Sequence, residues 1–108
     1  MARKKVEVRI VAPQNDGEAE ALVVTAWFKL PAGAQASQLV HIIREDERTH
    51  QSLSREAFGW SIDVAYPSTI RVEICVDLEG AMRRFDEKLL TVRDIVAHML
   101  DVLQSTIG

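Results

Sequence analysis

The stretch from residue 70 to residue 78 alternates strictly between apolar and polar side chains. Its apolar members occupy every second position, namely Ile70, Val72, Ile74, Val76 and Leu78. Between them lie Arg71, Glu73, Cys75 and Asp77. Because successive side chains of a β-strand point to opposite faces, this stretch has one apolar and one polar face. It predicts a strand with one buried side and a second layer of structure packed over that side.

Length and composition are those of one ordinary globular domain. The chain has 108 residues, of which 47% are hydrophobic and 27% charged. A chain of this size buries roughly two-thirds of its unfolded surface and needs no disulfide or metal to form a core. We therefore expect a single α+β domain spanning residues 1–108.

Charge and cysteine content indicate which cellular compartment and which classes of binding partner to expect. Thirteen basic and sixteen acidic residues give a net charge of −3, and the basic clusters at 3–5 and 83–84 lack interleaved aromatic residues that could stack on bases. No segment approaches the roughly 20 apolar residues that cross a bilayer, and the first residues do not resemble a signal peptide. Cys75 is the single cysteine, which excludes an internal disulfide and suits a reducing compartment. We expect a cytoplasmic protein that binds neither nucleic acid nor membranes.

Further alternation predicts strands over residues 5–10, 22–30 and 60–66, separated by segments rich in turn residues. A stripe at helical spacing predicts a helix from about residue 36 to residue 50, formed by Ala36, Leu39, Val40 and Ile43. After Arg44 the apolar pattern stops, so this helix either projects beyond the sheet or gives way to a polar loop. Residues 82–85 are expected to add a short fifth strand at an edge.

The last element is predicted as an amphipathic helix that begins at Thr91. Thr91 is a good N-cap, Asp94 follows at capping-box spacing, and Leu90 and Ile95 are placed to form a hydrophobic staple. The buried stripe of this helix comprises Val92, Val96, Met99 and Leu103. The whole pattern predicts a two-layer α+β sandwich of order ββαββ(β)α. A mostly antiparallel sheet of four or five strands has two helices on one face, and neighbouring strands form hairpins.

The hairpin–helix–strand order of the first 66 residues resembles the start of the ubiquitin-like β-grasp. The resemblance is one of pattern alone and involves no sequence motif. It implies a ubiquitin-like adaptor as a third possibility for function.

Few residues suggest chemistry. His41 and Glu45 share a helix face, as do Asp94, His98 and Asp101, and we expect both groups to face water. Such convex surfaces exclude no solvent and offer too few ligands for a metal. Cys75 lies between two carboxylates that raise its pKa, which disfavours a nucleophilic thiolate. We expect no metal and no cofactor, and the balance favours a protein that is not an enzyme.

The uncovered face of the sheet carries the strongest functional signal. If Leu22, Val24, Ala26 and Phe28 pack beneath the helices, Val23 and Trp27 face away from them. Tryptophan is enriched at binding hot spots, whereas lysine and arginine stems covering it would be an ordinary structural arrangement. We expect a non-catalytic interaction or adaptor module that associates with itself, as a homodimer, or with another protein through Val23 and Trp27.

A small enzyme or ligand-binding protein is the alternative. Its site would lie at a sheet end or at a dimer seam. The residues from which we would build it are His50, Arg55, Trp60 and Tyr66.

Overall fold

The computed structural model describes residues 2–12, 20–66, 68–78 and 82–108, apart from the side chains of residues 66 and 82–84. Its elements in chain order are β1 (Arg3–Val11), β2 (Glu20–Lys29), α1 (Ala36–Glu45), α2 (Glu47–Glu56), β3 (Gly59–Tyr66), β4 (Thr69–Leu78) and α3 (Met82–Ile107). The α+β class and the hairpin–helix–hairpin–helix order predicted from the sequence are confirmed. No helix within these ranges is long and apolar enough to span a membrane.

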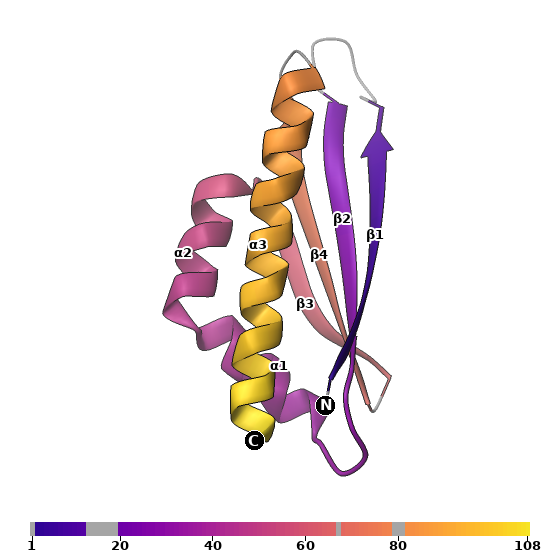
Figure 1. The fold of residues 1–108 in the computed structure, drawn as a ribbon, viewed down its shortest axis with the longest axis vertical. Coiled ribbons are helices and arrows are strands. Elements are labelled where there is room, and N and C mark those ends of the chain that lie inside the picture. Colours follow the sequence, from indigo (N-terminus) through magenta and orange to yellow (C-terminus); the bar gives the residue numbers. More distant parts are fainter. Residues whose placement is uncertain (1, 13–19, 67, 79–81) are drawn as a thin grey trace.

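The sheet has four antiparallel strands in the order β1-β2-β4-β3 (Figure 1). Both expected hairpins are present, and the pairing of β2 with β4 joins them into one sheet. In that register Val24 lies opposite Val8 on one side and Ile74 on the other. The two strands with the most buried side chains, β2 and β4, therefore occupy the centre, and β1 and β3 form the edges.

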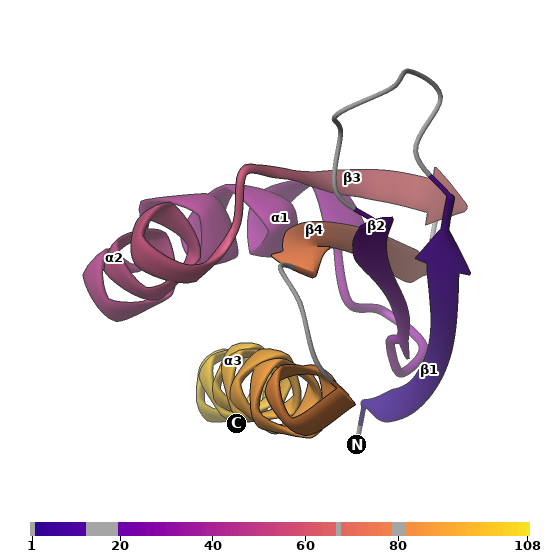
Figure 2. The same cartoon turned by 90° about the horizontal axis from the view of Figure 1, so that it is seen from above.

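All three helices lie on one side of the curved sheet (Figure 2). Beneath them the central strands contribute fully buried side chains, among them Leu22, Val24, Phe28, Ile70, Val72 and Ile74. The helices add Leu39, Val40, Ile43, Leu53, Val92, Val96, Met99 and Leu103. The predicted strand over residues 70–78 thus has its apolar face in the core, as its alternation requires.

The first helix does not continue to residue 50 but ends at Glu45, and a second helix follows. Asp46 between them is extended (φ −63°, ψ 117°), and its carboxylate accepts a hydrogen bond from the Thr49 amide at 3.0 Å. Aspartate is a preferred N-cap because its side chain satisfies a free amide of the first turn. The polar segment after Arg44 is therefore neither a projecting helix nor a loop. It is an elbow leading into α2, which Leu53 anchors in the core.

The last helix begins nine residues earlier than predicted, at Met82. The expected fifth strand at residues 82–85 is wrong, because this segment forms the first turn of α3. The cap at Thr91 is also wrong, since the Thr91 hydroxyl donates to the Glu87 carbonyl within the helix at 3.0 Å and Leu90 is exposed. Residues 82–90 are mostly good helix formers, and a threonine bonded to the preceding turn is tolerated inside a helix.

Candidate functional site

The face of the sheet opposite the helices is covered by long charged side chains. Val23 is only 6% exposed, and the Lys5 ammonium lies 5.5 Å from the centroid of the half-buried Trp27 ring. Arg71 donates to Glu73 at 2.6 Å, and Arg9 approaches the same carboxylate at 4.0 Å. The stems of these residues shield the central strand as amphipathic side chains commonly do. Val23 and Trp27 do share this face, but neither is freely presented to a partner.

The two edge strands differ sharply in charge. Five of the nine residues of β1 are charged, namely Arg3, Lys4, Lys5, Glu7 and Arg9. Among the eight residues of β3 only Asp63 is charged. Exposed edges present unpaired backbone groups to other chains, and charged residues are a common protection against such pairing. The β1 edge has this protection and the β3 edge lacks it.

Exposed apolar side chains gather at the unprotected edge. Phe58, just before β3, is 61% exposed, and Trp60 and Val64 within the strand are 37% and 42% exposed. The other large exposed apolar residues of the described ranges are Ile10 and Val11 at the end of β1 and Leu90 on α3. Trp60 and Val64 point to the same side of the sheet as Ile62, which is buried beneath α1. The β3 edge thus combines a side that no further strand of the described sheet pairs with and an apolar flank.

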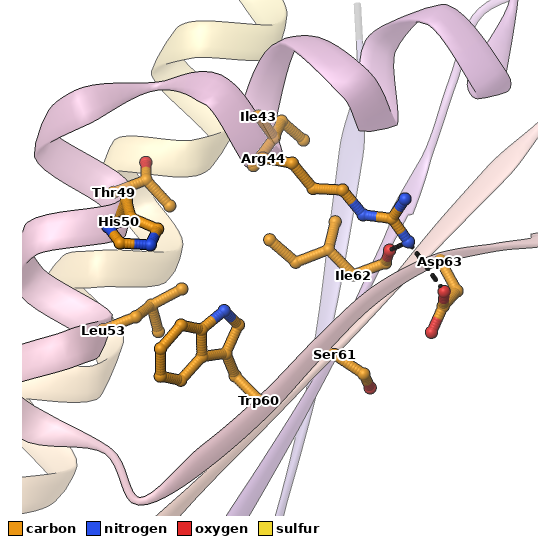
Figure 3. A pocket seen from close by; sticks show the side chains of 9 residues that line it. All are labelled: Ile43, Arg44, Thr49, His50, Leu53, Trp60, Ser61, Ile62 and Asp63. Atoms are coloured by element: carbon orange, nitrogen blue, oxygen red, sulfur yellow. Dashed lines mark hydrogen bonds and ion pairs between the residues drawn. The ribbon is translucent and has the colours of Figure 1, made fainter.

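A cleft of about 420 Å³ separates the α1–α2 elbow from β3 (Figure 3). Its helical wall comprises Ile43, Arg44, Thr49, His50 and Leu53, and its strand wall comprises residues 60–63. Trp60 and Ile62 belong to one face of β3 and Ser61 and Asp63 to the other. Because both faces contribute, the cleft runs along the outer edge of the strand.

Two contacts define the polar and aromatic character of the cleft. The Arg44 guanidinium donates to the Ile62 backbone carbonyl and, at 2.9 Å, to the Asp63 carboxylate. The rings of His50 and Trp60 meet edge to face, with centroids 6.2 Å apart and planes at 86°. Arg44 therefore occupies one backbone acceptor at the β3 edge.

The structure unites two of the four residues predicted for a ligand pocket. His50 and Trp60 line the same cleft, whereas Arg55 lines a separate groove of about 240 Å³ between α2 and α3 and bonds to Glu56. The side chain of Tyr66 lies outside the described residues. Arg44 and Asp63 were missed, because a charged residue at the end of a helix gives no sign of which distant strand it will reach.

His98 does not face water, contrary to the sequence-based expectation. Its Nε2 atom lies 2.8 Å from Oδ2 of Asp46, the oxygen that also accepts from the amide and hydroxyl of Thr49. Burial raises the pKa of Asp46, but the hydrogen bonds from His98 and Thr49 outweigh burial and leave this pKa below its ordinary value. These contacts tie α3 to the elbow that forms one wall of the cleft.

The other side chains considered for chemistry are not arranged as a catalytic or metal site. His41 and Glu45 form an exposed pair at 3.3 Å, and Asp94 and Asp101 are exposed on α3. Burial, followed by the charge of Glu73, raises the pKa of the Cys75 thiol. Within the described ranges no three metal-ligating side chains gather into a group that could hold an ion.

Comparison with known proteins adds no relative. No protein-family model, curated protein or solved structure matches the chain.

Proposed function

We propose that this domain is a non-catalytic protein-interaction module that associates with itself through the outer edge of β3. The observation that carries the proposal is the contrast between the two edges of one sheet. The β1 edge has five charged residues, whereas β3 has one and is flanked by the exposed Phe58, Trp60 and Val64. Strand addition at such an edge gains backbone hydrogen bonds and buries the apolar flank in one step.

The face around Val23 and Trp27 is the alternative surface for the same function. A partner that reached Trp27 would have to displace the Lys5 ammonium from its ring, at a cost of about 0.5–1 kcal/mol for an exposed cation–π contact. Val23 would still lie beneath its charged neighbours. The β3 edge needs no such rearrangement of the apolar groups that it offers.

The contact between His50 and Trp60 favours a second candidate function, the binding of a small molecule in the cleft. A volume of about 420 Å³ lies within the range of small-molecule sites, and the walls combine two aromatic rings with one guanidinium. A compact ligand with an aromatic ring and an anionic group matches these walls.

Sedimentation velocity across protein concentrations, with native mass spectrometry, tests the proposal. We expect an assembly of the wild type that Val64→Lys weakens at least tenfold. Val11→Lys is the matched control, because Val11 is a similarly exposed valine on the opposite edge. Thermal unfolding of each variant shows whether the fold survives.

The possible outcomes are distinct. A wild type that stays monomeric at millimolar concentration refutes self-association. An assembly that Val11→Lys weakens and Val64→Lys does not refutes the β3 edge. A monomer with a retained small molecule, lost on Trp60→Ala, supports the second candidate.

A further inference from the structure

We propose that two copies of this chain pair their β3 strands antiparallel about a two-fold axis at Ile62, giving one continuous eight-stranded sheet. The inference rests on the proposed function and deepens it by specifying the partner, the symmetry and the register. We compare the possible alignments, or registers, of the two β3 strands by the side chains that each would place opposite one another.

The geometry of a sheet limits the registers available. In a continuous antiparallel sheet, directly opposed residues point to the same face. Trp60, Ile62 and Val64 point toward the helices, and Ser61 and Asp63 point away from them. A two-fold axis between two β3 strands must therefore place one residue directly opposite its own copy. An axis that placed two consecutive residues opposite each other would oppose side chains of different faces.

Charge and length discriminate among the registers that remain. An axis at Asp63 would place two like carboxylates directly opposite each other, which is unfavourable. An axis at Ser61 would pair only residues 59–63 of the strand, and one at Val64 would leave Trp60 without a partner. An axis at Ile62 pairs residues 60–64 of each copy, the stretch before the irregularity between Val64 and Tyr66, and gives both Trp60 and Val64 a partner.

The Ile62 register is also self-complementary in chemistry. Trp60 lies opposite Val64 of the second copy, an aromatic–β-branched pair of the kind that stabilises antiparallel strands. Ser61 lies opposite Asp63 of the second copy, so its hydroxyl can donate to that carboxylate. Each contact occurs twice because the interface is two-fold, and the symmetry closes the assembly at a dimer.

Arg44 has to yield both of its contacts with β3 in this arrangement. Its guanidinium donates to the Ile62 carbonyl, and a backbone amide of the second copy would replace the guanidinium as the donor to this acceptor. The half-exposed Arg44 side chain has to withdraw toward the helices, and it also gives up Asp63, which points to the other face of the sheet. The pairing thus exchanges two side-chain hydrogen bonds of Arg44 for a ladder of backbone hydrogen bonds.

Disulfide trapping tests the register. In a Cys75→Ser background, Ser61→Cys and Asp63→Cys proteins are prepared separately, mixed and oxidised. Directly opposed Cα atoms are about 4.5–5.5 Å apart, within the range that a disulfide bridges. Two copies of Cys at position 61 would lie roughly 8 Å apart, offset by two residues, and so would two at position 63. We expect the mixture to give cross-linked dimer in at least tenfold excess over either protein alone.

The controls separate this inference from the proposed function. Arg9→Cys, exposed on β1, should remain uncross-linked. A dimer that Val64→Lys disrupts, but in which one single-cysteine protein cross-links with itself, refutes the Ile62 register and leaves the β3 edge in place. A protein without any dimer refutes both.

Discussion

Nε2 of His98 lies 2.8 Å from Oδ2 of Asp46 and so joins the middle of α3 to the elbow between α1 and α2. The same oxygen caps α2 through the amide of Thr49. One half-buried carboxylate therefore sets both where α2 begins and how the helical wall of the cleft sits against α3.

We predict that Asp46→Asn lowers the free energy of unfolding by about 1–2 kcal/mol at pH 7, because asparagine still caps α2 but lacks the charge that strengthens the hydrogen bond with His98. The folded-state pKa of Asp46 is depressed below its ordinary value of 3.8, so its contribution is present above that value. The contribution disappears as the pH falls through the folded-state pKa. Urea unfolding at pH 7 and at successively lower pH measures the difference between the two proteins.

The pH dependence supplies the check on this interpretation. Protonated Asp46 resembles asparagine, so the stability difference should shrink as the medium becomes acidic. Glu45→Gln at the exposed neighbouring position is the matched control and should change little. A difference that stays constant down to strongly acidic pH would show that the charge of Asp46 is not involved.

We predict that Glu87→Pro destabilises the domain by about 3 kcal/mol or more, because proline removes a helical hydrogen bond and clashes with the preceding turn. Glu87 is exposed inside α3, and its carbonyl accepts the Thr91 hydroxyl. Glu87→Ala is the control, and circular dichroism with urea unfolding is the measurement. Near-wild-type stability of the proline variant would mean that the helix begins at Thr91 after all.

The strands were predictable because apolar residues recur at every second position in each of them, most strictly in β4. The core residues of β2 and β4 follow directly from that alternation, as do the two hairpins. The end of α1 and the start of α3 were not predictable, because several polar residues near each boundary can cap a helix. Asp46 is used as a cap and Thr91 is not, and tertiary contacts such as the one from His98 decide between them.

The site was less predictable than the fold. His50 and Trp60 were both singled out, yet their meeting depends on the elbow at Asp46, after which α2 begins and carries His50 to Trp60. The charged cover over Trp27 depends on strand order, since Lys5 and Arg71 come from the strands on either side of it. A single sequence specifies alternation within each strand and leaves the neighbours of each strand open.

We predict that Trp27→Ala lowers the free energy of unfolding by about 2 kcal/mol and leaves self-association unchanged. The ring is half-buried and carries the Lys5 ammonium, so its removal loses packing and the cation–π contact. Lys5→Met tests the ammonium alone and should cost less. A folded Trp27→Ala protein with weakened association would instead place the interface on the uncovered face of the sheet.

We predict that Arg44→Met strengthens self-association severalfold. In the monomer Arg44 occupies the Ile62 carbonyl, which the paired strand of a second copy needs as an acceptor. Methionine keeps most of the apolar stem against the cleft but cannot donate, so the edge stays open at little cost in packing. Arg48→Met removes a charge on α2 outside the wall of this cleft and is the matched control. Sedimentation velocity at matched concentrations measures the change, and weaker association of Arg44→Met would mean that the guanidinium supports the interface instead of guarding it.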